Sequence, residues 1–231
     1  MDRLTVQEAL EAMRAAGDPS ALPAMARYGI SAVYGNRIPQ LRALARRAGR
    51  DHALAQALWS TGVHEARLLA TMVADPALFT EGEAERWALD LRSWDLCDQL
   101  CLNLLVRTPF AWKKAREWPC REEELVRRAG FSLIAVLAVH DKAAPDARFL
   151  ALLPLVEEGA RDDRQLVRKA VSWALRQVGK RDLELNAAAI AVAERLRARE
   201  DRSSRWVASD ALRELRSEAV QARLRARPPK I

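Results

Sequence analysis

The feature that most constrains this chain is its helical periodicity. Apolar residues recur at spacings of three and four along almost every segment, and no stretch alternates long enough to predict a strand. Breaks rich in Gly, Pro, Asp or Ser interrupt the pattern at short intervals, such as GDPS at 17–20, TG at 61–62 and HDKAAPD at 140–146. The sequence therefore predicts an all-α protein of about a dozen helices, each roughly 10 to 18 residues long.

Similar helices recur in the second half of the chain. LVRRAGFSLIAVL from Leu125 aligns without gaps to LVRKAVSWALRQV from Leu166, a spacing of 41. DALREL from Asp210 then echoes WALRQV from Trp173 at a spacing of 37. Helix pairs at such intervals are typical of HEAT and armadillo proteins, whose inner helices line a concave groove. We expect a HEAT-like or armadillo-like solenoid with a concave basic groove; a helical bundle is the alternative.

No long linker divides the chain, so we expect a single repeat domain over 1–231. Residues 1–30 would form its N-terminal helices. The basic stretch 225–231 would be either a disordered tail or the end of the last helix.

The charge balance favours a polyanionic partner. The chain has 38 Lys and Arg against 31 Asp and Glu, which gives a formal net charge of +7 and a pI near 9.8. This excess fits nucleic acid, although a solvated Arg-rich surface would also explain it. The start of the chain lacks a targeting pattern, and no apolar run approaches the roughly 20 residues of a membrane helix, so we expect a cytoplasmic protein without membrane contact.

The cysteines and histidines show no pattern that indicates a disulfide or a metal site. The three cysteines, Cys97, Cys101 and Cys120, form no CxxC pair and are expected to be reduced core residues. Phosphate-binding glycine motifs and HExxH are absent, and the histidines lie on separate segments, so we expect no cofactor and no metal. His64 begins the motif HEAR and is expected to pair with Glu65 or Arg67.

The segment RSWDLCDQL at 92–100 places Trp94 and Asp98 four residues apart. Residues at this spacing share a helix face, while Asp95, Gln99 and Asn103 form a separate polar stripe. Neither neighbouring turn offers Asp98 a Lys or Arg. This leaves Asp98 as the candidate reactive carboxylate.

A second unusual residue is the tryptophan of QLVRKAVSWALRQVGK. Its helix has an apolar side, and Trp173 lies on the opposite side. Lys169, Arg176 and Lys180 share that side, so burying Trp173 would draw cations inward. An aromatic ring among cations suits a nucleic-acid surface, although a ring packed against a neighbouring helix is the alternative.

Arg127 and Arg128 precede a helix that becomes apolar all round. The row Arg128, Ser132, Ala135 has side chains of decreasing size and would let another surface approach. Arg128, at the first position of this row, would then offer a forked hydrogen-bond donor to a phosphate group. The alternative is that Arg128 is simply a solvated arginine.

The motifs MARYGI, HEAR, SWDLCD, VRRAGF and RKAVSWALRQVGK resemble those of the HEAT-repeat alkylpurine DNA glycosylases of the AlkD type. The resemblance runs from about Ala24 to Leu215. In that family a Trp and an Asp four apart, an Arg and a second Trp line the lesion site. Position by position, this implies catalytic roles for Trp94, Asp98, Arg128 and Trp173. We also expect DNA contacts from Tyr28, Arg127, Lys169, Arg176 and Lys180.

The resemblance implies hydrolysis of the N-glycosidic bond of cationic N3- or N7-alkylated purines in duplex DNA, by a monomer that associates with the nucleoid. Two other readings stay open. One is a non-catalytic module that binds damaged or branched DNA, in which Asp98 would be dispensable. The other is a protein-interaction scaffold, a common use of HEAT solenoids.

Overall fold

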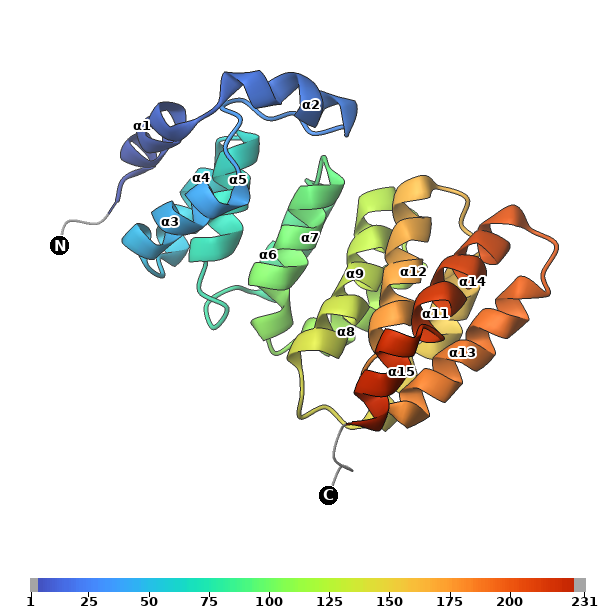
Figure 1. The fold of residues 1–231 in the computed structure, drawn as a ribbon. Coiled ribbons are helices and arrows are strands. Elements are labelled where there is room, and N and C mark those ends of the chain that lie inside the picture. Colours follow the sequence, from blue (N-terminus) through green and yellow to red (C-terminus); the bar gives the residue numbers. More distant parts are fainter. Residues whose placement is uncertain (1–3, 227–231) are drawn as a thin grey trace. The chain divides into compact units, whose positions relative to one another are not determined.

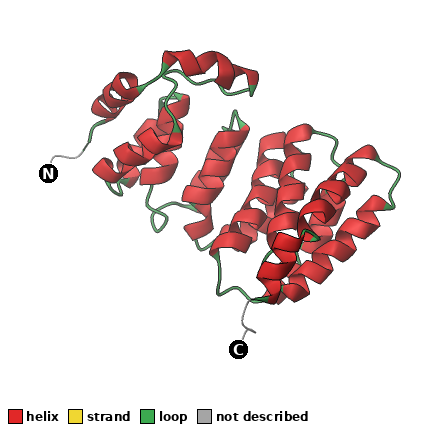
Figure 2. Ribbon diagram, in the orientation of Figure 1, coloured by secondary structure: helices red, strands yellow, loops and turns green. Residues whose placement is uncertain are grey.

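The structure is a computed structural model that describes residues 4–226, in which every regular element is a helix (Figure 1, Figure 2). The predicted all-α class is confirmed. Some helices are shorter than expected, such as α10 (Asp146–Leu150) with five residues. The chain divides into two compact units, Met1–Phe110 and Ala111–Ile231, which are described separately. The expected single repeat domain stays a prediction.

The first unit contains seven α-helices and two 3-10 turns within its described part. Its elements are α1 (Val6–Ala16), η1 (Pro19–Ala21), α2 (Leu22–Arg27), α3 (Ile38–Ala48), α4 (His52–Ser60), α5 (His64–Val73), α6 (Glu81–Leu89), α7 (Trp94–Asn103) and η2 (Leu105–Arg107). Helices α3, α5 and α7 pack in succession, and α4 packs against α5. Helix α5 is therefore central, and its residues Leu69, Ala70 and Val73 are fully buried.

The second unit repeats this arrangement. Its elements are α8 (Ala111–Glu117), η3 (Trp118–Cys120), α9 (Glu124–His140), α10, α11 (Leu153–Gly159), α12 (Gln165–Gly179), α13 (Leu183–Arg197), α14 (Arg202–Leu215) and α15 (Glu218–Arg225). Helices α9, α12 and α14 pack in succession, while α11 and α13 also pack against α12 (Figure 1). The two-layer row of helices is what the repeat pattern predicts.

Local chemistry starts and ends these helices where the sequence has its breaks. Thr80 accepts from the amide of Glu83, whose carboxylate in turn accepts from the Thr80 amide at 2.7 Å, a reciprocal cap for α6. Asp182 caps α13 through the Leu185 amide at 2.9 Å. After α4, Gly62 adopts φ 73°, a left-handed conformation that favours glycine.

The cysteine prediction is confirmed at two positions and wrong at one. None of these three cysteines forms a disulfide, and Cys97 and Cys101 are buried in α7. Cys120 ends the short turn η3 and is exposed, because Trp118 and Pro119 form the buried side of this turn.

Candidate DNA-processing site

Helix α7 presents Trp94 and Asp98 as the sequence predicts. Trp94 is the first residue of the helix, Asp98 lies one turn later, and both side chains are half-buried. The indole Nε1–H of Trp94 donates to the carbonyl oxygen of Tyr28 at 3.1 Å. Tyr28 itself is 71% exposed. Three predicted site residues are thus brought together, with the ring of Trp94 held in one orientation.

A buried carboxylate holds the segment that follows Tyr28. Glu65 is fully buried in α5 and accepts hydrogen bonds from the backbone amides of Val33, Tyr34 and Gly35 at 2.8 to 3.0 Å. These charge-assisted bonds offset the cost of burying a carboxylate. The sequence pattern does not reveal this role of Glu65, because its partners are about thirty residues away in the chain and donate through the backbone.

The polar stripe of α7 faces α5. Asp95 accepts from His64 Nε2 at 2.9 Å, and Asn103 Nδ2 donates to Thr71 Oγ1 at 3.0 Å. The expected pairing of His64 with Glu65 or Arg67 is therefore wrong, since tertiary packing supplies a better acceptor. Burial by itself raises the pKa of Asp95, but the hydrogen bond and charge of His64, with smaller contributions from Ser93 and Leu96, lower that pKa below its usual value.

In the second unit, Trp173 is half-buried on α12. In the amide orientation of Gln177 that satisfies its neighbours, the Gln177 oxygen accepts from Trp173 Nε1–H at 3.1 Å. Lys169, one turn earlier, is exposed. The predicted apolar side of this helix is buried at Ala170, Val171 and Ala174.

Two of the predicted basic residues turn toward α14. Arg176 pairs with Asp210 at 3.3 Å and with Glu214, and Lys180 Nζ lies 2.5 Å from Glu214 Oε1. Burial raises the pKa of Glu214, but the hydrogen bonds and charges of Lys180 and Arg176 outweigh this effect and lower it. Two of the three cations expected on this side are therefore already paired with carboxylates.

The row from Arg128 is not an open approach surface, which corrects the sequence prediction. Arg128 is 5% exposed, Ser132 and Ala135 are fully buried, and the Arg128 guanidinium donates to the Leu166 carbonyl at 2.6 Å. The neighbouring Arg127 lies 3.2 Å from Asp162. The apolar surroundings of α9 enclose this row, so Arg128 binds the start of α12 rather than facing solvent.

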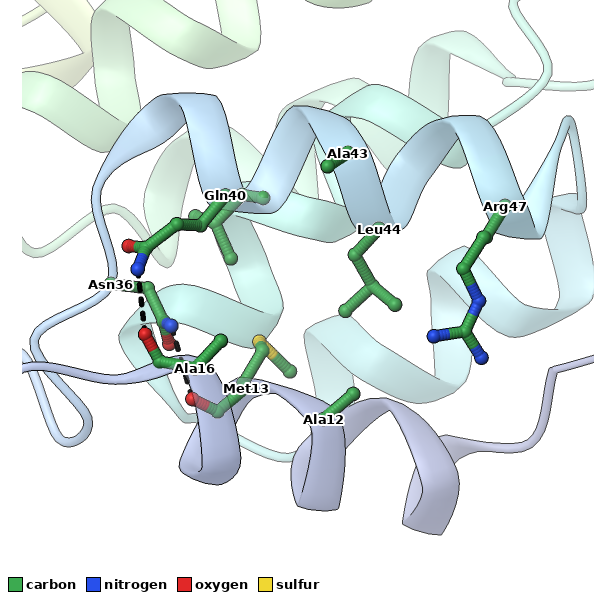
Figure 3. Close-up of a pocket in the computed structure, with 9 residues that line it drawn as sticks. Ala12, Met13, Ala16, Asn36, Gln40, Ala43, Leu44 and Arg47 are labelled. Carbon is green, nitrogen blue, oxygen red and sulfur yellow. Dashed lines mark hydrogen bonds between the residues drawn. The ribbon is translucent and has the colours of Figure 1, made fainter.

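An apolar hollow of 190 Å³ lies between α1 and α3 (Figure 3). At one end, Gln40 Nε2 donates to the Ala16 carbonyl at 2.6 Å and Asn36 Nδ2 donates to the Met13 carbonyl at 3.0 Å (Figure 3). These two hydrogen bonds join α1 to the start of α3 and to the residue Asn36 before it. This hollow lacks a set of reactive side chains.

Residues 4–226 contain no cluster of three or more His, Cys, Asp or Glu side chains placed to hold a metal ion. In the same part of the chain, no helix is both long enough and apolar enough to cross a membrane.

Comparison with solved structures identifies the fold. One structure, from "a new family of proteins related to the HEAT-like repeat DNA glycosylases with affinity for branched DNA structures", aligns with a TM-score of 0.77 and 19% identity. The alignment covers 92% of this chain and 96% of the other. The predicted HEAT-like fold is confirmed. A designed armadillo repeat protein in complex with a (KR)4 peptide aligns with a TM-score of only 0.35 and 14% identity, which does not bear on the fold.

The sequence comparison identifies the family. No curated protein matches the chain significantly. The family model of the DNA alkylation repair enzymes matches residues 9–215, which is most of the chain and nearly the span of the resemblance noted in the sequence motifs. The chain therefore belongs to the DNA alkylation repair enzyme family.

Proposed function

We propose that this protein is a DNA glycosylase that hydrolyses the N-glycosidic bond of purines alkylated at N3 or N7 in duplex DNA. Membership of the DNA alkylation repair enzyme family supports this function. The observation that carries it is the pair Trp94 and Asp98 on one face of α7, each half-buried, with the indole fixed by the Tyr28 carbonyl. Side chains four apart on a helix have Cβ atoms about 5–6 Å apart, so one sugar can contact both.

The chemistry requires little more than a carboxylate and a ring face. Alkylation makes the base cationic, so the base leaves as a neutral molecule with the electron pair of its glycosidic bond and needs no general acid. Positive charge develops on the deoxyribose. The Asp98 carboxylate opposes that charge and orients the attacking water, whose oxygen bonds to the anomeric carbon while its proton passes to Asp98 or solvent. Trp94 stabilises the cationic sugar through its ring face.

The other predicted residues would bind the DNA around this step. Trp173 would provide a second ring and the exposed Lys169 a phosphate contact. Arg176 and Lys180 would have to exchange Glu214 for phosphate, and Arg128 would have to leave the Leu166 carbonyl. Among these cations, we therefore assign the strongest phosphate contact to Lys169. The monomeric state and the cytoplasmic, nucleoid-associated location stay predictions.

The test is single-turnover release of free base from duplex DNA that contains N7-methylguanine. We expect Asp98→Asn to slow release by about 100-fold or more, because the variant lacks the charge that opposes the sugar cation, while duplex affinity stays within about twofold. Asp163→Asn makes the same chemical change at an exposed position of the second unit and should release base like the wild type. Equal rates for Asp98→Asn and the wild type would remove this carboxylate from the mechanism.

A second candidate is a DNA-binding module without this activity. The contact of Arg128 with the Leu166 carbonyl favours it, because this contact keeps Arg128 from the catalytic role that the resemblance implies. This candidate also fits the branched-DNA affinity named for the structurally similar protein. In that case neither the wild type nor Asp98→Asn would release base, and both would bind a four-way junction more tightly than a linear duplex of equal length.

A further inference from the structure

The first unit contains a strongly basic pocket of 340 Å³ away from Trp94. Helix α3, the turn after it, α5, the end of α7 and η2 all contribute to its wall. The lining residues are Arg42, Ala45, Arg46, Gly49, Arg50, Met72, Asn103 and Arg107. Four of these eight residues are arginines, and none is acidic.

The arginines come together through both sequence spacing and tertiary structure. Arg42, Arg46 and Arg50 are four residues apart, so the first two share one face of α3 and the third follows in the turn. The backbone amide of Asp51 donates to the Val73 carbonyl at 2.9 Å, which ties that turn to the end of α5. Arg107 arrives from η2, where its Nη1 donates to the Asn103 carbonyl at 2.7 Å.

These four arginines are exposed, and within the described residues none of them forms an ion pair with a carboxylate. The acidic residue next to them in the chain, Asp51, caps α4 by accepting from the Leu54 amide at 2.9 Å. The negative end of the α3 dipole offsets part of their mutual repulsion but provides no discrete anion. Unlike Arg176 and Lys180, this cluster keeps its full charge for an external ligand.

We propose that this pocket binds a backbone phosphate of the DNA duplex that is held at Trp94, as a second anchor remote from the lesion. Guanidinium groups bind phosphate oxygens through paired hydrogen bonds, and four of them from three segments can follow a strand without reading its bases. The proposal rests on the proposed DNA-repair function. It identifies which part of the first unit holds the strand.

The geometry of α7 sets the distance between the two sites. Trp94 begins the helix and Asn103 ends it, so at 1.5 Å per residue they lie about 14 Å apart along its axis. A duplex that follows α7 covers this length in about four base-pair steps of 3.4 Å. The phosphate in the pocket should therefore be about four nucleotides from the alkylated one.

The first experiment compares two double variants that each remove two positive charges. Arg46→Gln with Arg107→Gln changes the pocket, while Arg86→Gln with Arg116→Gln changes exposed arginines of α6 and α8 as the matched control. Affinity for an unmodified duplex is measured from 50 to 200 mM salt. We expect the pocket variant to bind about tenfold more weakly at the lowest salt and to lose about two phosphate contacts from its salt dependence, with the control close to the wild type. Equal behaviour of the two double variants would overturn the proposal.

The second experiment locates the phosphate. Single phosphates of a duplex containing N7-methylguanine are replaced in turn by neutral methylphosphonates, and affinity is measured for the wild type and the pocket variant. A neutral linkage about four nucleotides from the lesion should weaken wild-type binding severalfold and leave the pocket variant unchanged. Equal losses in both proteins at every position would overturn the proposal.

Failure of this proposal is distinguishable from failure of the proposed function. Normal base release with no effect of the pocket substitutions on binding rejects only the pocket. Absence of base release with a pocket-dependent salt slope rejects only the glycosylase and keeps the phosphate site.

Discussion

At the scale of single residues, the pair His64–Asp95 fixes the α7 face that presents Trp94 and Asp98. Both side chains are mostly buried, and the pKa of Asp95 lies below its usual 3.8 because the interactions with His64 outweigh the effect of burial. A lowered carboxyl pKa contributes stability above the unfolded pKa, and this contribution is lost as the pH falls through the folded pKa. We expect Asp95→Asn to lower the free energy of unfolding at pH 7 by about 1 kcal/mol.

The pH dependence provides the sharper measurement. Below about pH 4, wild-type stability should fall toward that of Asp95→Asn, because the wild type then loses the same ionised partner. Urea unfolding at pH 7, 5 and 3.5 measures the gap, which is the difference in free energy of unfolding between the wild type and Asp95→Asn. Asp163→Asn, at an exposed position, is the control. A gap of constant size across this range would mean that ionised Asp95 does not stabilise the fold.

At the scale of elements, the contact of α9 with η3 depends on a glycine. A Cβ atom added at Gly130 would lie 2.4 Å from Pro119 Cδ and 2.5 Å from Pro119 N. The obstacle includes backbone, which a side-chain rotation cannot relieve. We expect Gly130→Ala to destabilise the protein by about 1–3 kcal/mol, although alanine favours helix, and urea midpoints measure the change.

Gly82→Ala in α6 provides the comparison. There the nearest atom to a new Cβ is Arg86 Nη1 at 3.7 Å, the end of a flexible side chain. This substitution should stabilise the protein by about 0.5 kcal/mol through reduced freedom of the unfolded chain. Similar small changes in stability for both substitutions would show that η3 can move away from α9 without destabilising the protein.

At the scale of the whole molecule, the salt dependence of binding distinguishes DNA binding by this chain, with its net charge of +7, from the protein-scaffold reading. Each phosphate that the protein neutralises releases a counterion, so the logarithm of the affinity should fall linearly with the logarithm of salt concentration, by about 0.9 per contact. Fluorescence anisotropy with labelled duplex measures this slope. An affinity for DNA that does not change with salt would contradict phosphate-dominated binding, and an apolar protein interface would then be favoured.

Features that depend on neighbours within one or two helical turns can be predicted from the sequence. Spacings of three and four predict the helices, the buried side of α12 and the shared face of Trp94 and Asp98, because helical periodicity is a local property. The motifs also predicted the family that matches residues 9–215.

Which charges are available to a ligand depends instead on contacts between helices that are distant in the sequence. Glu214 forms ion pairs with Arg176 and Lys180, which lie more than thirty residues away in the chain. Arg128 donates a hydrogen bond to the backbone carbonyl of Leu166. Conversely, helix packing brings Arg107 beside the row from Arg42 to Arg50 without a carboxylate in the pocket wall. The helical pattern predicts on which side of a helix a cation lies. The partner of that cation depends on which neighbouring helix packs against that side, and the packing of the apolar core determines which helix this is.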